Sequence, residues 1–154
     1  MGKSEKDNFS SIAAFIGSFL VSLETRPRDI IRARYGLDGG EPATLQAIGN
    51  RYGITRERVR QIEAGALSEL RRSAGAPYVK RLTDEAVRRL KEVGGVEHEE
   101  NFFTALRGAM ADHGVPAVFV NSATFLLELP RKVSRYRDAL SNWYPYWYLG
   151  EADR

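Results

Sequence analysis

The segment Thr55–Glu63, entered from Tyr52-Gly53-Ile54, constrains the fold of this sequence most. A helix turns by about 100° per residue, which divides this segment and its continuation into two faces. The apolar face carries Val59, Ile62, Ala66 and Leu70. The polar face carries Arg56, Glu57, Arg60 and Gln61. The pattern predicts a helix that packs through one side and presents long polar side chains on the other.

These polar side chains have the chemistry that reads DNA bases. Arginine pairs with the guanine edge, glutamate accepts from the cytosine amino group, and glutamine pairs with adenine in the major groove. We therefore predict that Arg56, Glu57 and Gln61 contact bases. An ordinary explanation exists for each residue alone, because the helix dipole favours Glu57 in a first turn and arginines are common on solvated faces.

The residues before this helix complete a helix-turn-helix. Thr44 is suited to cap a short supporting helix, which would bury Leu45, Ile48 and Tyr52. Gly53 falls where the turn needs a positive φ, and Thr55 would cap the second helix, which we expect to run to Arg72.

Three blocks in this part of the chain, 24–37, 44–49 and 53–64, match a known family in order and spacing. With the amphipathic helix expected around Ile12, Phe15, Phe19 and Leu23, residues of about 12–72 resemble region 4 of the sigma-70 family of RNA polymerase sigma factors. The resemblance implies a four-helix domain that recognises the upstream promoter hexamer. It also implies phosphate contacts, which would fall on Arg26, Arg34, Thr55, Arg58 and Arg60.

In that family, the first helices also dock on the flap of the polymerase β subunit. The corresponding apolar residues here are Phe15, Phe19, Ile30 and Ile31. A four-helix domain needs such residues for its own core, so burial is the competing interpretation.

The sequence departs from the family in two ways. Gly65 and Ser68 stand where family members usually carry basic residues, so the phosphate grip and promoter preference are expected to differ. Nothing in the chain resembles the family's regions 2 and 3, so we do not expect it to act as a complete sigma factor.

The chain has 154 residues, of which 43% are hydrophobic, and this length allows two small domains. We predict a flexible N-terminus at 1–8, the sigma-like domain at 9–73, a linker at 74–79 and a second domain at 80–150. The formal charge of +3 is compatible with nucleic acid but too small to argue for it.

The second half predicts three helices and a hairpin. The helices would begin at Thr83, near Glu97 and near Ser122, and end at Gly94, Gly114 and Leu129. Strands at 132–138 and 143–149 would flank a turn at 139–142. This order resembles a winged helix, so the fold class is mainly α: a sigma-region-4-like helix-turn-helix domain followed by a small winged-helix domain.

The hairpin would carry basic side chains and a run of aromatic ones. Candidate wing contacts to DNA phosphates are Lys132, Arg135 and Arg137. A protein contact surface is the alternative. The aromatic residues at 143–148 could stack on exposed bases, anchor a protein interface or fill the core.

Catalytic chemistry is not expected. The chain has no cysteine, which excludes a disulfide, an iron–sulfur cluster and a cysteine zinc site. The group Glu97-His98-Glu99-Glu100, with His113, does not match the helical two-histidine zinc pattern. We predict no enzyme activity, no metal, no cofactor and no small-molecule substrate.

The stretch 9–23 is too short, and too interrupted by serines, to span a bilayer, which takes about 20 apolar residues. We expect a cytoplasmic protein with no membrane contact. Its predicted function is sequence-specific binding of double-stranded, promoter-like DNA in transcription. The alternative is a protein-interaction module that binds core RNA polymerase, for example through the β flap, or another transcription factor without reading DNA.

Overall fold

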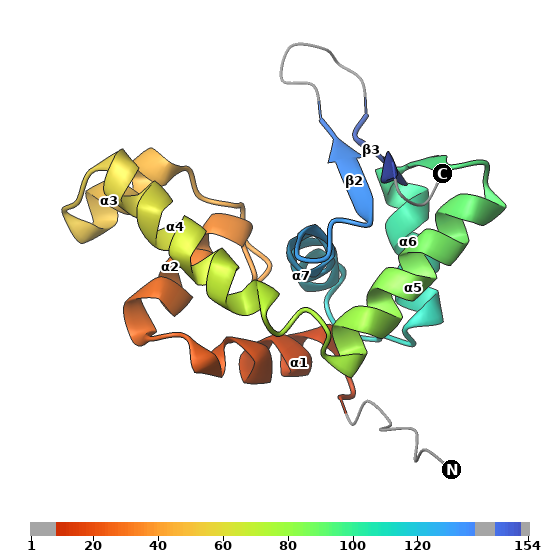
Figure 1. Cartoon of the computed structure of the whole chain (residues 1–154), viewed down its shortest axis with the longest axis horizontal. Coiled ribbons are helices and arrows are strands. Elements are labelled where there is room, and N and C mark those ends of the chain that lie inside the picture. Colours follow the sequence, from red (N-terminus) through yellow and green to blue (C-terminus); the bar gives the residue numbers. More distant parts are fainter. Residues whose placement is uncertain (1–8, 138–143, 152–154) are drawn as a thin grey trace.

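The computed structural model describes residues 9–137 and 144–151 of the chain (Figure 1). The helices are α1 (Ile12–Phe19), α2 (Thr25–Tyr35), α3 (Leu45–Tyr52), α4 (Arg56–Arg71), α5 (Pro77–Glu92), α6 (Glu99–Ala109) and α7 (Pro116–Glu128). A 3-10 turn, Leu20–Ser22, follows α1. The strands are β1 (Val96–His98), β2 (Val133–Tyr136) and β3 (Tyr146–Leu149). The predicted fold class is confirmed in being mainly helical, with α3 and α4 forming the predicted helix-turn-helix.

The first half forms its helices where local sequence favours them. Ser11 caps α1 by accepting a hydrogen bond from the Ala14 amide, and Gly36 ends α2 in the left-handed region at φ 63°. Helices α2, α3 and α4 pack around a small core of Ile30, Ile48 and Val59, all fully buried. This core fixes the angle between the two helices of the helix-turn-helix.

The second half places a three-stranded antiparallel sheet against α5, α6 and α7, in the strand order β1-β3-β2. Its central strand β3 pairs Trp147 with Glu97 of β1 and with Arg135 of β2. Trp147 is buried and stacks on Phe102 of α6, with ring centroids 5.2 Å apart. The tryptophan therefore belongs to the core, as one of the predicted alternatives had it.

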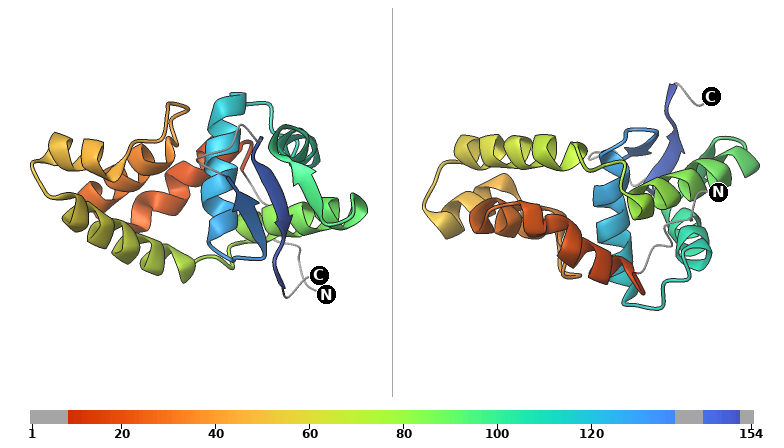
Figure 2. Two further views of the ribbon diagram at one scale, coloured as in Figure 1. Left: turned by 90° about the horizontal axis from the view of Figure 1, so that it is seen from above. Right: turned by 60° about the horizontal axis from the view of Figure 1, so that its bottom comes forward.

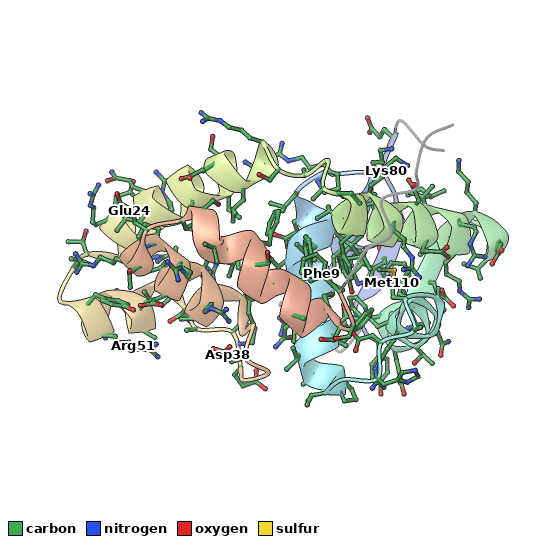
Figure 3. All side chains as sticks on the ribbon, turned by 90° about the horizontal axis from the view of Figure 1, so that it is seen from below. Phe9, Glu24, Asp38, Arg51, Lys80 and Met110 are labelled. Atoms are coloured by element: carbon green, nitrogen blue, oxygen red, sulfur yellow. The ribbon has the colours of Figure 1, made fainter. Side chains whose placement is uncertain are left out.

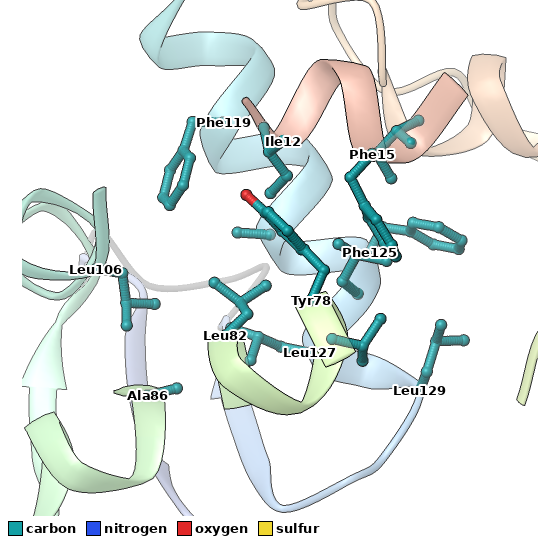
Figure 4. Packing of buried hydrophobic residues seen from close by; sticks show 14 of the residues in the cluster. Ile12, Phe15, Tyr78, Leu82, Ala86, Leu106, Phe119, Phe125, Leu127 and Leu129 are labelled. Atoms are coloured by element: carbon teal, nitrogen blue, oxygen red, sulfur yellow. The ribbon is translucent and has the colours of Figure 1, made fainter. Parts of the chain in front are cut away.

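A larger core joins the two halves. Figure 4 shows Tyr78 of α5 reaching toward Ile12 and Phe15 of α1, beside Phe125 of α7. The backbone amide of Ile12 donates to the carboxylate of Asp112, in the loop after α6, at 2.7 Å. Helix α1, although it precedes the helix-turn-helix in sequence, thus packs on the C-terminal half and is anchored there.

Several predicted boundaries in the second half are wrong. Helix α5 begins at Pro77, not at Thr83, so residues 77–79 of the predicted linker are helical. Thr83 lies buried inside α5 and donates its hydroxyl to the carbonyl of Val79 at 2.7 Å. Helix α7 begins at Pro116, not at Ser122. Proline suits the first position of a helix, because the amide it lacks has no partner there.

The sequence also gave no indication of β1, and α6 ends at Ala109 rather than near Gly114. The hairpin strands are shorter than predicted, and the turn expected at 139–142 lies outside the described residues. Among the described helices, we find none with the length and apolar character needed to cross a membrane.

Candidate nucleic-acid interface

The helix that carries the candidate base contacts has the predicted two-faced character. Thr55 caps α4 by accepting from the Arg58 amide at 3.1 Å. Val59, Ala66 and Leu70 are buried, while Arg56, Glu57, Arg60 and Gln61 are exposed. The cap stabilises the first turn of α4, where the candidate base contacts begin.

The turn before α4 is tight. Gly53 ends α3 at φ 65°, the left-handed conformation that the sequence predicted. Gly49 packs so closely on the turn that a Cβ there would lie 2.7 Å from the carbonyl oxygen of Ile54. Thr44 caps α3 through the Ala47 amide at 3.1 Å. These contacts hold α3 and α4 in a fixed helix-turn-helix.

The polar side chains of α4 pair with one another. Arg60 donates two hydrogen bonds to the Glu57 carboxylate, at 2.9 and 2.7 Å, and Arg58 donates one to Gln61 at 3.3 Å. The hydrogen bond from Arg60 is the main reason why the pKa of Glu57 is lowered. Both partners of this ion pair are more than half exposed, at 57% and 59%. Such a pair is weak in water, so either side chain can leave it at little cost.

Arg26 and Arg34, the candidate phosphate contacts on α2, differ in exposure and in their hydrogen bonds. Arg26 is exposed and lies over the Tyr52 ring, with its guanidinium carbon 5.4 Å from the centroid. Arg34 is half-buried and donates to the Ala43 carbonyl at 3.1 Å, with Glu63 at 3.4 Å. Arg34 thus links α2 to the loop before α3 and to α4, whereas Arg26 stands at the surface.

Sequence reasoning did not name Arg51, which is exposed in the last turn of α3. Figure 3 shows Arg51 on the side of the helix-turn-helix away from the C-terminal half. The available signal was its place in the last turn of a helix, where the helix dipole favours a basic side chain.

The candidate wing residues are not equivalent. Arg135 is held inside the second half, where it donates to the Glu99 carboxylate at 2.6 Å. The Trp147 indole donates to the same carboxylate at 3.1 Å. Lys132 and Arg137, at the two ends of β2, are exposed. The structure therefore separates one structural arginine from two surface cations.

Helix α7 is the third helix of the second half in sequence order, which the winged-helix prediction would place in a DNA groove, and most of its side chains are buried or half-buried. Asn121 of α7 donates to the carbonyls of Gly36 and Gly40, at 2.8 and 3.1 Å. Tyr35 of α2 donates to Glu128 at the end of α7, at 3.0 Å. Because α1 and α2 cover this helix, it is not available to enter a DNA groove.

The apolar residues that the resemblance connected with polymerase docking are also covered. Phe15, Phe19, Ile30 and Ile31 are at most 9% exposed. Phe15 stacks on both Phe19 and Tyr78, with centroids 5.2 and 4.5 Å apart. The competing interpretation, burial in the core, holds for all four.

Two carboxylates of the acidic run 97–100, which spans the end of β1 and the start of α6, form ion pairs within the fold. Glu97 pairs with Arg89 of α5, and Glu99 pairs with Arg135. Within residues 9–137 and 144–151, no group of three or more acidic or histidine side chains could hold a metal ion.

The two sets of candidate contacts lie far apart. Figure 2 shows the N-terminal end of α4 at the far end of the molecule from the sheet. A helix of 16 residues is about 24 Å long, so the candidate base contacts and the hairpin do not form one compact site.

Taken together, the capped α4, the tight turn and the small core define a helix-turn-helix unit with an outward polar helix face. Comparison with known proteins then connects this unit with a family. The family model "Sigma-70, region 4" matches residues 19–72, and the predicted resemblance is confirmed over that segment.

Curated relatives match over the same region. RNA polymerase sigma factor SigA of Nostoc sp. is 58% identical over 52 residues, which are 34% of this chain and 13% of that protein. SigA1 of Synechococcus elongatus and SigA of Synechocystis sp. are each 56% identical over 52 residues, 34% of this chain and 13% and 12% of theirs. The match thus spans about an eighth of each relative. It supports a transcription-related, DNA-binding role for a third of this chain.

Proposed function

We propose that the protein binds double-stranded DNA sequence-specifically in transcription, with α4 in the major groove. The observation that carries the proposal is the exposed row of Arg56, Glu57 and Gln61 on a capped helix within the segment that matches region 4. In this proposal these three side chains read base edges, and Arg26, Thr55, Arg58 and Arg60 hold phosphates. Lys132 and Arg137 are further candidates for backbone phosphates.

The ion pair between Arg60 and Glu57 supports separate roles for the two side chains, phosphate binding by Arg60 and base reading by Glu57. In the free protein Glu57 holds Arg60. When Arg60 turns to a phosphate, Glu57 is released toward the bases, where a cytosine amino group can replace the lost donor. Phosphate binding and base reading would then be coupled through two side chains one turn apart.

The first experiment selects preferred sites from a random duplex pool with the full chain. Binding of a chosen site and of scrambled duplexes is then measured as a function of salt. The Arg56→Ala variant is expected to lose about 1 to 3 kcal/mol on the preferred site and to relax preference at one base pair. Equal weakening on every duplex would show that Arg56 does not read bases.

The Arg60→Ala variant is expected to bind all duplexes more weakly and to flatten the salt slope by about one unit. A matched control is Arg88→Ala on α5. Like Arg60, Arg88 is exposed and paired with carboxylates of its own helix, in this case those of Glu85 and Glu92. The control should bind like the parent. An unchanged salt slope in Arg60→Ala would remove that residue from the phosphate contacts.

One feature favours a second function, a protein-interaction module without DNA readout. Beyond Gln61, the outer side of α4 presents the exposed small residues Gly65 and Ser68, where region 4 usually has basic residues. In this case the chain would bind core RNA polymerase or another transcription factor. Binding to purified core polymerase without salt-sensitive DNA binding would favour this second function over the first.

A further inference from the structure

The outer face of the sheet is a second surface, separate from α4. Strand pairing puts Trp147 and Arg135 side by side on the inner face, where Val133 and Leu149 are also buried. Because side chains alternate along a strand, the residues between them face outward. The outer face consists of Val96, His98, Ser134, Tyr136, Tyr146 and Tyr148.

Three tyrosines form a continuous aromatic row on this face. Tyr136 and Tyr146 are opposite each other in the register and are stacked, with centroids 4.9 Å apart and planes at 19°. Tyr146 and Tyr148 follow at 6.2 Å. Tyr136 is 43% exposed and Val96 is 52% exposed, although both lie on strands. Beside the row lies a hollow of about 520 Å³, lined by the tyrosines, Val96 and the Gly94-Gly95 turn.

The charges around the face suit an anionic ligand. None of the six outer-face residues is acidic. The strand carboxylate Glu97 alternates to the inner side, where it pairs with Arg89. The exposed cations Lys132 and Arg137 bracket β2, while Glu151 follows the end of β3. By the same alternation Lys132 falls on the outer side of β2, whereas Arg137 falls on the inner side and reaches the aromatic row around the end of the strand. Positive charge therefore lies at the two ends of β2.

The size of the face argues against a stable protein partner. Three strands of three or four residues, spaced about 4.8 Å apart, give a backbone sheet only about 13 by 10 Å across. A specific protein interface takes about 800 Å² from each partner. A few nucleotides need much less area, since bases stack on single aromatic rings and cations hold the phosphates between them.

We propose that this tyrosine face (Tyr136, Tyr146 and Tyr148) binds single-stranded nucleic acid. Bases stack on the exposed ring surfaces and in the hollow beside Tyr148, and Lys132 and Arg137 hold phosphates. Binding is sequence-tolerant, because every base offers a flat ring surface, and it weakens with salt. The proposal does not rest on duplex reading by α4, since α4 contributes no residue to the tyrosine face. Lys132 and Arg137, named above as further candidates for duplex phosphates, hold the phosphates of the single strand here.

Anisotropy of labelled 12-nucleotide single strands, one of thymidines and one of mixed sequence, tests this with the full chain. The double variant Y136A/Y148A is expected to bind each strand about fivefold more weakly or worse, which corresponds to the loss of at least one stacked base. The conservative variant Y136F/Y148F keeps both rings and should bind like the parent. This pair separates stacking from a merely structural role, and thermal melting of both variants checks that they fold.

Charge variants test the phosphate contacts. Lys132→Ala and Arg137→Ala should each lower the salt slope of single-strand binding, whereas Lys91→Ala, an exposed lysine on α5, should not. The Arg56→Ala variant should leave single-strand binding unchanged, so that failure of this proposal and failure of duplex reading are distinguishable.

Three results would overturn the proposal. The first is no binding of either strand at protein concentrations up to about 100 μM at low salt, where stacking and phosphate contacts together should be detectable. The second is unchanged single-strand binding in the folded Y136A/Y148A variant. The third is a Y136A/Y148A variant that loses binding to core RNA polymerase but keeps its oligonucleotide affinity, which would assign the face to a protein.

Discussion

Phe15 of α1 stacks on Tyr78 of α5, with ring centroids 4.5 Å apart and planes inclined by 12°. Both rings are buried in the core that also contains Phe125 and Leu126 of α7. The contact ties the helix before the helix-turn-helix to the first helix of the C-terminal half. The stability of the two halves should therefore be coupled through this pair.

Replacing Phe15 by Ala is expected to destabilise the whole chain by about 3 to 5 kcal/mol, because a buried ring is lost and a cavity remains. In a double-mutant cycle with Tyr78→Ala, the coupling should be about 0.5 to 1.5 kcal/mol. Urea unfolding followed by circular dichroism measures both. Ser18→Ala, on the exposed side of α1, serves as the control. An F15A variant that unfolds in two separate steps, with the helix-turn-helix unaffected, would contradict the coupling.

Asn121 is the second link between the halves. Its side-chain amide donates to the Gly36 carbonyl at 2.8 Å and to the Gly40 carbonyl at 3.1 Å. Asn121→Ala removes both bonds, but the Gly36 carbonyl keeps the donor that the Gly39 amide supplies at 2.9 Å, so we expect a cost of about 0.5 to 1.5 kcal/mol. The exposed Asn101→Ala on α6 is the matched control. Equal unfolding midpoints for the two variants would show that the bonds from Asn121 contribute nothing.

Local patterns predicted much of the helix-turn-helix. The 3.6-residue period of Val59, Ala66 and Leu70 fixed the buried face of α4, and the conformation of Gly53 followed from its place in the turn. These features depend on residues that are close together in the sequence, so they can be predicted from it. The family resemblance added the order of the helices.

The second half was harder, because its boundaries depend on tertiary packing. Pro77 falls in the predicted linker and Pro116 lies before the helix predicted near Ser122, yet each begins a helix. The three residues of β1 form a strand only because β3 lies beside them. The inner position of Arg135 follows from strand register, which depends on which side of the hairpin meets the core. The sequence alone shows Arg135 only as one of three basic residues on the predicted hairpin.

Glu128 gives a prediction that depends on pH. Its pKa is raised, mainly by desolvation, although the hydrogen bond from Tyr35 partly opposes the shift. The folded state therefore holds the proton more tightly than the unfolded state. The contribution of Glu128 to stability is therefore largest below its unfolded pKa of about 4.3, and it is lost as pH rises from there through the folded pKa.

Glu128→Gln removes this ionisation and keeps an oxygen that can accept from Tyr35. At pH 7 the variant should be more stable than the parent by only about 0.5 kcal/mol. The gain is small because residue 128, although partly desolvated, is still exposed to water, which screens the charge of the parent carboxylate. At pH 4 and below, the advantage should shrink toward zero. Thermal melting at both pH values measures the difference, with Glu100→Gln as the exposed control. A variant less stable than the parent at pH 7 would mean that the ionised carboxylate is favourable to the fold.

Arg135 tests whether the hairpin arginines are structural or bind DNA. Its guanidinium and the Glu99 carboxylate are only 26% and 17% exposed, and Trp147 donates to the same carboxylate. Arg135→Ala leaves this carboxylate without its cation, so we expect a loss of about 2 to 4 kcal/mol in the free energy of unfolding. Adding Glu99→Gln should recover part of the loss, since the stranded charge is gone.

Lys132→Ala and Arg137→Ala are the matched controls, because both side chains are exposed at the ends of the same strand. Each should change stability by less than about 0.5 kcal/mol. Urea unfolding gives the stabilities, and duplex binding is measured only under conditions in which every variant is folded. The prediction would be contradicted by an Arg135→Ala protein that is as stable as its parent but binds duplex DNA more weakly. That result would mean that Arg135 contacts DNA and that its ion pair with Glu99 does not stabilise the fold.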